Sequence, residues 1–365
     1  MKSSCLLLLG ISLAGIVTTA SAQFNTIAND TWWKDTQGNP IYAQSGGISK
    51  FGSTYYWYGV QYGGASTYYS TGTSNSDTNF VAINVYSSTD LVHWTFQNAV
   101  VTTNTKWFNF GSDSDPTSLE DAGWVSRMGS VVYNPTSKLY VLWVQYDGPA
   151  GTGMACCTCS TPTGNFTFNN VQTSIANVYD SLPGDSTIFC DIDHGSTPYF
   201  ICSDSHGREH AYVCPLSSTY EAINSATLIS EWPQGQEANN MFVYKGTYYY
   251  IMSNLAGWSY SSAYAVWSSS ILTPSDYTKD AAFAGTTATF THWAQVSFAI
   301  MLEGSSTETI VMACDRWADF NGDYAKAGHG AGLYEWCPVT FSGTTPTFND
   351  ETTWQINAAT GAWEK

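Results

Sequence analysis

Short apolar runs separated by turn residues recur along the whole chain, and no run shows the sustained 3.6-residue apolar period of a helix. The most regular unit is a short apolar strand, a tight turn and a second strand rich in Tyr, Trp, Ile or Val. Five copies start at Gly46, Ser130, Ser186, Asn240 and Val296. Copies spaced roughly 50 to 80 residues apart suit one four-stranded sheet each. The pattern predicts an all-β chain, a five-bladed β-propeller of four-stranded antiparallel blades.

The N-terminal segment is predicted to be a signal peptide and not part of the fold. Met1-Lys2 is followed by an apolar run from Leu6 to Val17 and by the small residues Ala20-Ser21-Ala22, the pattern of a secretory leader. The apolar run is too short to span a bilayer. We therefore expect residues 1-22 to be removed, residues 23-365 to form one propeller domain, and the mature protein to be secreted and extracellular.

The charge balance restricts the partners. A formal charge of −17 with only 12 basic residues argues against nucleic acid and anionic membranes, which need many Lys and Arg to neutralise them. A neutral oligosaccharide or polysaccharide fits better, and we expect a monomer without a cofactor. Aromatic residues make up 15% of the chain, with 15 Trp. They are either sugar-stacking platforms or core residues, and core is the commoner role.

The cysteines and sequons also fit a secretory route. Eight cysteines follow the leader, an even number that favours disulfides of unknown pairing. The segment from Cys202 to Cys214 also contains His206 and His210, which are possible zinc ligands, but a disulfide across a hairpin is the plainer interpretation and we expect no metal. The sequons at Asn29 and Asn165 suggest a glycoprotein.

The five repeats carry polar residues at the same position relative to the turn. About eight to ten residues before each turn, the chain carries Gln44, Ser126-Arg127, Asp185, Glu237 and Gln295. In a propeller the first strand of each blade lines the central axis, so these side chains converge on one mouth of the channel.

Two of these positions are carboxylic acids, Asp185 and Glu237. Glycoside hydrolysis needs a carboxylic acid that protonates the leaving oxygen, and a second carboxylate nearby helps to keep that acid protonated. The alternatives are that Asp185 caps a turn and that Glu237 is a solvated loop residue. The matched phase favours the catalytic interpretation.

The segment SSTDLVHWTF, from Ser87 to Phe96, resembles the Ser-x-Asp-Leu-x-x-Trp element of glycoside hydrolase family 43, five-bladed propellers that act with inversion. The likeness runs from Asp35 to Trp354 and is greatest to fungal exo-β-1,3-galactanases. Matching GDSTIF to that family implies an auxiliary acid at Asp185. The segments QEANNMFVYKGTYYYIMSNLAGW, QVSFAI and CDRW resemble the segments of the general acid, of a water-holding glutamine and of the last blade, and the first two imply these roles for Glu237 and Gln295.

The chain departs from the family at several positions. Gln44 occupies the position where most members carry the base carboxylate, so the resemblance implies that Gln295 holds the attacking water, and Gln44 is the alternative. Two acidic residues that bind galactose in the relatives fall on Val60 and Ser126, which puts the galactose specificity in question.

Further substrate contacts are expected at the channel mouth. Trp258 and Trp317 are candidates for the aromatic floor of a sugar subsite, with blade packing as the alternative. Arg127 and Arg316 either bind sugar hydroxyls or form structural ion pairs. Asn254 completes the expected substrate-binding set.

The sequence thus predicts an inverting exo-β-1,3-galactanase acting on arabinogalactan. An α-L-arabinofuranosidase or a β-galactofuranosidase of the same family is the alternative enzyme, and a non-catalytic carbohydrate-binding propeller is the alternative of another class. A sialidase is disfavoured because it needs an Arg cluster and a Tyr nucleophile, and Arg208 is expected to lie in a turn, where such a cluster does not form.

Overall fold

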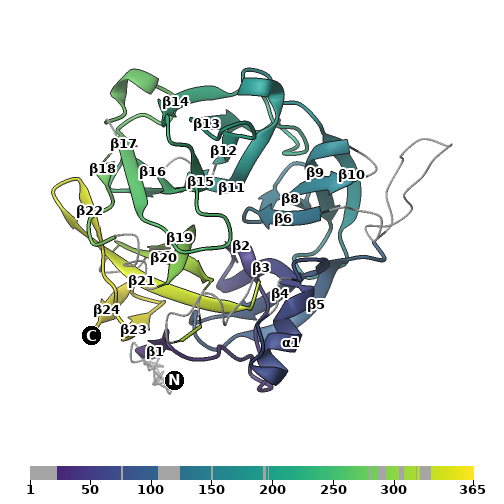
Figure 1. The fold of residues 1–365 in the computed structure, drawn as a ribbon, viewed down its shortest axis with the longest axis vertical. Helices are drawn as coiled ribbons and strands as arrows, with labels where there is room; N and C mark the ends of the chain where they lie inside the picture. The colour runs from purple at the N-terminus through teal and green to yellow at the C-terminus, as the bar shows by residue number, and fades with distance from the viewer. Residues whose placement is uncertain are drawn as a thin grey trace, which may run out of the picture.

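The computed structural model describes residues 23–74, 77–105, 124–148, 151–191, 195, 197–278, 281–286, 293–303, 308–317, 319–320 and 330–365. The predicted signal peptide, residues 1–22, lies outside the described residues. Over the described ranges the chain is all-β, with six antiparallel sheets (Figure 1).

Five of the sheets are meanders that follow the chain order. The first sheet contains β2 (Gln44–Phe51), β3 (Thr54–Tyr62), β4 (Phe80–Ser88) and β5 (Thr95–Thr102), with α1 (Gly63–Thr71) after β3. The second contains β6 (Trp124–Met128), β7 (Val132–Asn134), β8 (Leu139–Gly148), β9 (Gly151–Cys159) and β10 (Thr167–Gln172). After the 3₁₀ turn η2 (Tyr179–Ser181), the third contains β11 (Pro183–Asp191), β12 (Thr197–Asp204), β13 (His210–Pro215) and β14 (Thr227–Glu231).

The last two meanders complete the series. The fourth contains β15 (Gln236–Tyr244), β16 (Thr247–Asn254), β17 (Ala263–Ser268) and β18 (Ala281–Ala282), with the 3₁₀ turn η4 (Pro274–Asp276) before β18. The fifth contains β19 (Ala294–Glu303), β20 (Glu308–Arg316), β21 (Leu333–Ser342) and β22 (Thr345–Phe348).

The count of five four-stranded sheets needs correction. A sixth sheet joins β1 (Asn25–Ala28) to β23 (Thr353–Asn357) and β24 (Ala362–Glu364). It pairs the two ends of the described chain, with Asn25 opposite Ile356, and neither end carries the repeated unit. The second meander has five strands because β6 and β7 both pair with β8.

The first strands of the five meanders contact one another in a ring. β2 contacts β6, β6 contacts β11, β11 contacts β15, β15 contacts β19, and β19 contacts β2. Figure 1 shows these strands nearest the common centre of the sheets. Residues at the same phase of these strands therefore come together, although they lie far apart in the sequence.

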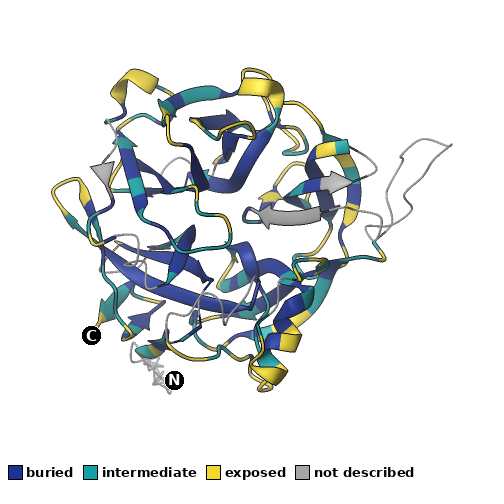
Figure 2. Ribbon diagram, in the orientation of Figure 1, coloured by how far each residue is buried: buried dark blue, intermediate teal, exposed yellow. Residues whose placement is uncertain are grey.

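Apolar side chains fill the spaces between neighbouring sheets, and Figure 2 shows buried residues along many of the strands, with exposed residues mainly in turns and at the outer edge. Most of the large aromatic side chains belong to this packing. Among the described residues, six Trp side chains are fully buried: Trp57, Trp94, Trp143, Trp317, Trp336 and Trp354. Core packing thus accounts for much of the aromatic surplus. Within the described residues, no helix is long and apolar enough to cross a membrane.

The expected disulfides are absent from the structure, in which all eight described cysteines are free thiols. Cys202 faces Tyr212 and Cys214 faces Phe200 across β12 and β13, so the two cysteines are diagonal neighbours. Their side chains lie on the same face of the sheet, and the Cys202 thiol contacts that of Cys214. Burial raises the pKa of the Cys202 thiol well above its ordinary value, which makes it a poor nucleophile.

One of the two sequons is buried. The Asn29 side chain is 0% exposed, and its Nδ2 donates to the carbonyls of Trp336 at 2.9 Å and Glu351 at 2.8 Å. A glycan on Nδ2 would break this connection between the chain ends, so glycosylation at Asn29 is incompatible with the fold. Asn165 is exposed and stays a candidate.

In a eukaryotic secretory host, glycan attachment is therefore expected at Asn165 alone. Peptide mass spectrometry before and after glycosidase treatment gives the occupancy of each sequon, with Asn165→Gln as the control that removes the modification. Substantial occupancy at Asn29 in folded protein would contradict the buried position of its side chain.

Candidate active site

Each inner strand carries a β-bulge close to its predicted site residue. In β2, Gln44 faces Val60 and Gly47 faces Tyr58, so one extra residue lies between them. The register of β6, β11, β15 and β19 shifts in the same way. A bulge releases a backbone N–H from the ladder and redirects a side chain. Five bulges at one level therefore create polar backbone and side-chain groups at one end of the ring.

The bulges of β11 and β15 bind Asp185. This residue lies within the bulge of β11, where only Ser203 faces the Gly184-Asp185 pair. Asp185 is 4% exposed, and its Oδ2 accepts the backbone N–H of Ala238 at 2.8 Å. Ala238 has a left-handed φ of 58°, which a bulge imposes and which aims this N–H away from the ladder. The bulge of one sheet thus holds the carboxylate of a neighbouring sheet.

Glu237 immediately precedes this bulge and is 4% exposed. Its Oε1 accepts two hydrogen bonds, from the backbone N–H of Ala256 at 2.8 Å and from Nε2 of Gln295 at 2.7 Å. Its Oε2 accepts from Nη1 of Arg208 at 3.0 Å. Because Oε1 is used twice as an acceptor, a proton on this carboxyl group belongs on Oε2.

Arg208 lies between the two acids. The same Nη1 that contacts Glu237 lies 3.2 Å from Oδ1 of Asp185. Arg208 lies in a turn, as the sequence predicts, with a φ of 53°, but the contact of its side chain with the two acids was not predicted. Opposite charges at this distance favour the ionised carboxylates.

A buried aspartate fixes the Arg208 turn. Asp204 is 0% exposed; its Oδ1 accepts the Arg208 N–H at 3.1 Å, and its Oδ2 accepts the His210 N–H at 2.9 Å. The Arg208 carbonyl then accepts the N–H of Gln236 at 2.8 Å, one residue before Glu237. The spacing of Asp204, Arg208 and His210 is the sequence signal for this turn, and it is easily mistaken for a metal motif.

Gln295 contacts the acid directly. Besides Glu237, its Nε2 donates to Oγ of Ser253 at 3.0 Å, while its Oε1 accepts from Nε1 of Trp317 at 3.1 Å. Inverting hydrolases keep the acid and the water-activating group ~6.5 to 9.5 Å apart, so that the sugar and water fit between them. In this conformation Gln295 instead orients Glu237, and its role as water holder stays a prediction.

Gln44 is held by backbone groups of the last meander. Its Nε2 donates to the Leu333 carbonyl at 3.1 Å and its Oε1 accepts the Gly332 N–H at 3.0 Å. The side chain is 1% exposed. Both ends of this amide thus connect β2 to the segment entering β21, which gives Gln44 a structural role and weakens its case as the alternative water holder.

The aromatic candidates differ in exposure. Trp258 is partly exposed and packs edge to face against Trp317 at 4.9 Å and against Tyr62 at 5.2 Å between ring centroids. Trp317 is 2% exposed. Trp258 therefore provides the accessible ring near Gln295, and the buried Trp317 ring packs against it.

Arg316 pairs with carboxylates other than Asp185 and Glu237, which corrects its placement among the substrate contacts. Its side chain is fully buried and its Nη1 lies 2.6 Å from Asp30 and 3.3 Å from Glu335. This is the structural ion pair that the sequence left as the alternative. Breaking such a buried pair leaves an uncompensated charge and typically costs about 3–5 kcal/mol.

The remaining candidates lie at the edges of the site. Asn254 follows Ser253 on β16, and its Nδ2 donates to the Tyr264 hydroxyl at 3.3 Å. Val60 is buried in the apolar core. Ser126 and Arg127 belong to β6, which pairs with β8, and their side chains lie outside the described residues.

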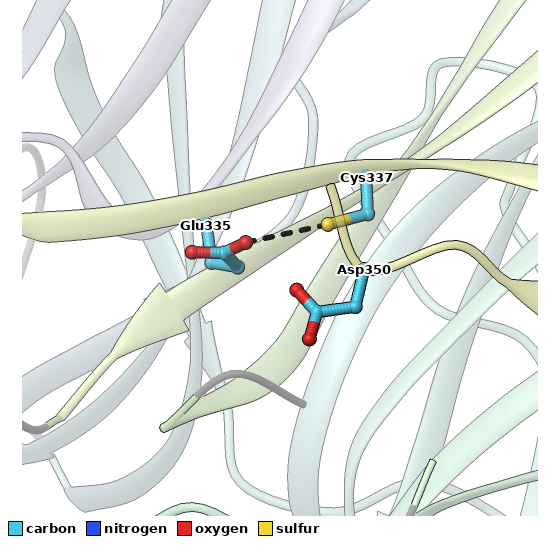
Figure 3. Close-up of side chains that lie close together, drawn as sticks. All are labelled: Glu335, Cys337 and Asp350. Atoms are coloured by element: carbon cyan, nitrogen blue, oxygen red, sulfur yellow. Dashed lines mark hydrogen bonds between the residues drawn. The ribbon is translucent and has the colours of Figure 1, made fainter. Parts of the chain in front are cut away.

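Among the described residues, one group of possible metal ligands lies close together. Figure 3 shows Glu335 and Cys337 of β21 beside Asp350. The Cys337 thiol donates to Glu335 at 3.4 Å, burial raises its pKa well above the ordinary value, and Arg316 compensates the Glu335 charge. A protonated thiol beside a paired carboxylate fits a structural network better than a metal site.

The alternative zinc site is not assembled in the structure. His210 Nδ1 lies 2.9 Å from Asp204, and His206 Nδ1 lies 3.8 Å from Asp180. Cys202 and Cys214 are buried in a hydrophobic cluster. The two histidines are therefore paired with separate aspartates, while the two cysteines face the core.

No protein-family model and no curated protein matches the chain. Solved structures do match. An exo-β-1,3-galactanase from Clostridium thermocellum is 26% identical with a TM-score of 0.75, covering 93% of this chain and 68% of its own. One from Phanerochaete chrysosporium, with β-1,3-galactotriose bound to a variant, is 24% identical with a TM-score of 0.72, covering 93% and 70%.

A family 43 β-1,3-galactosidase with galactodeoxynojirimycin bound has the same fold, at 21% identity and a TM-score of 0.69, covering 89% of this chain and 99% of its own. These findings confirm the resemblance that the sequence segments predict. The chain is a glycoside hydrolase related to the family 43 exo-β-1,3-galactanases.

Proposed function

We propose that the protein is a secreted, inverting exo-β-1,3-galactanase that acts on the β-1,3-galactan of plant arabinogalactan. The five meanders form the blades of a five-bladed propeller, and the three-stranded sheet of β1, β23 and β24 ties the chain ends together. The ring of contacts among the five inner strands supports this architecture. The bound galactotriose and galactodeoxynojirimycin in related structures support galactose as the sugar.

One observation carries the proposal: Asp185, Arg208 and Glu237 meet where the inner strands β11 and β15 begin. Two buried carboxylates close enough to share one guanidinium nitrogen are not needed to hold a sheet together. They suit a site in which one acid transfers a proton and the other tunes its environment.

Glu237 serves as the general acid through Oε2. The two donors on Oε1 keep the carboxyl group in one orientation, so the proton on Oε2 points toward the position of Arg208. The Arg208 N–H and the O–H of protonated Glu237 are both donors, so the proton on Oε2 and the Arg208 N–H compete for the same place. Arg208 must therefore move toward Asp185, or onto a substrate hydroxyl, when the leaving oxygen takes its place.

Inversion also requires a water molecule on the far side of the sugar ring. Gln295 is the proposed holder, still anchored by Trp317 through Oε1. For this role, substrate entry must open the 2.7 Å contact between Gln295 and Glu237. Trp258 supplies the stacking face for the sugar.

A non-catalytic carbohydrate-binding propeller is the second candidate. It is favoured by the amide at Gln44, by the burial of Val60, and by the Arg208 contact that keeps Glu237 an acceptor. A furanosidase of the same family is a further alternative, which aryl furanoside substrates distinguish from a galactanase.

The Glu237→Gln variant decides between enzyme and binding module. In an enzyme, kcat on β-1,3-galactan falls by about 10²–10⁴-fold because the proton donor is lost, while galactotriose binding by calorimetry is retained. Glu308→Gln, the same change at an exposed position at the start of β20, serves as the control. Unchanged turnover in Glu237→Gln contradicts the proposed acid.

Replacing Arg208 by Met should move the alkaline limb of the kcat/KM profile to higher pH. Without the guanidinium at 3.0 Å, the protonated form of Glu237 is favoured over the ionised form and persists to higher pH. Lys245→Met removes an equal charge at the exposed far end of β15 and leaves the profile in place. A limb that stays fixed in Arg208→Met excludes the proposed coupling.

Gln295→Ala tests the water-holding role. Azide should restore part of its activity and yield the α-galactosyl azide, since a small anion can occupy the vacated space and attack with inversion. If Gln295 only orients Glu237, azide gives no rescue, and Trp317→Phe and Gln295→Ala lower kcat in parallel.

A further inference from the structure

A cavity lies farther along the same inner strands. Its volume is about 330 Å³, and its walls come from all five inner strand regions. On β2 it meets Ile48–Phe51, on β11 Thr187–Cys190, and on β19 Phe298–Met301. The proposed catalytic residues of β11, β15 and β19 lie near the starts of these strands, and none of Asp185, Arg208, Glu237 or Gln295 lines the cavity.

Close strand contacts separate the two regions. A Cβ placed on Gly47 would lie 2.8 Å from the backbone nitrogen of Ser130, and one on Gly129 would lie 2.2 Å from that of Ile188. The inner strands therefore touch through bare backbone between the bulges and the cavity. The cavity opens instead toward the opposite rim, where Lys50 is exposed and Tyr133 is 40% exposed.

The cavity wall is mainly apolar. Its lining includes aliphatic, methionine and aromatic side chains: Ile48, Val131, Ile188, Met241, Met301 and Phe298. Its serines donate to neighbouring backbone, Ser49 to the Val131 carbonyl and Ser130 to the Ile48 carbonyl. Of the lining residues that the structure describes, only Lys50 is charged, and its amine lies 4.9 Å from the Tyr55 ring centroid.

One buried acceptor stands out in this wall. The Asn240 side chain is 1% exposed, and its Nδ2 donates to the Ala238 carbonyl at 3.1 Å. Its Oδ1 has no hydrogen-bond partner among the described residues. A buried acceptor without a donor is unfavourable, so a ligand that supplies one donor at this depth gains from the contact.

The wall excludes several ligand classes. A sugar needs many hydrogen-bond partners, and among the described residues of the lining only Asn240 has a buried side-chain atom without one. A cation needs carboxylates, and the described lining residues include none. An anion is disfavoured by the formal charge of −17. The volume lies at the lower end of the ~300–1,000 Å³ typical of small-molecule sites.

We propose that this cavity binds a neutral aromatic alcohol or phenol, with the ring among the apolar side chains and the hydroxyl donating to Asn240 Oδ1. This site is distinct from the proposed catalytic centre and does not depend on the galactanase assignment.

Fluorescence titration of the full chain with 2-naphthol, at a pH where the naphthol is neutral, tests the proposal. 2-Methylnaphthalene has the same shape without the donor, and it should bind about five- to tenfold more weakly to the wild-type protein. In Asn240→Leu this preference should vanish. Equal affinity for both probes in the wild-type protein overturns the role of Asn240.

Ala299→Phe fills the cavity from β19 and should abolish 2-naphthol binding while hydrolysis of β-1,3-galactan is unchanged. Glu237→Gln should leave 2-naphthol binding unchanged and thereby serves as the matched control. Thermal unfolding of each variant shows that it is folded, and Ile48→Phe replaces Ala299→Phe if the latter does not fold. No saturable binding to the wild-type protein, or equal binding to the filled variant, overturns the proposal.

Discussion

The arrangement of the proposed catalytic end depends on one cation held between two buried acids. Asp185 and Glu237 are each 4% exposed, and without Arg208 their charges would repel one another with little solvent screening. The guanidinium compensates both charges from a single nitrogen. The same contact sets a requirement for substrate binding. A proton can occupy Oε2 of Glu237 only when Arg208 has moved away from this oxygen.

Irregular strands make this contact possible. The bulge of β15 turns the Ala238 N–H toward Asp185, and the bulge of β2 turns the Ser45 N–H toward Asp315 at 2.9 Å. Regular ladders would use these donors within their own sheets. Each bulge thus links one sheet to another through a carboxylate, so the site and the packing of the sheets are stabilised by the same hydrogen bonds. Asp204 adds the third support by fixing the Arg208 turn.

The strand pattern predicted much of this arrangement because side-chain alternation and turn residues are local properties. The repeated unit located the inner strands, and its phase selected Asp185, Glu237 and Gln295, which the structure brings together. The sixth sheet was missed because β1 and β23 pair across the length of the chain without repeating the unit. Arg208 was missed because a turn position says where the backbone lies, whereas its long side chain reaches two other strands. The burial of Arg316 depends on Asp30 and Glu335, which are distant in sequence and therefore invisible to local pattern.

The most direct test of the catalytic account is the anomeric form of the sugar first released from β-1,3-galactan. Time-resolved proton NMR of the wild-type reaction distinguishes the anomers before mutarotation mixes them. An acid at Glu237 with a water held on the opposite face predicts that galactose appears first as the α-anomer. Initial release of β-galactose, or no release from a folded protein that binds galactotriose, contradicts the account.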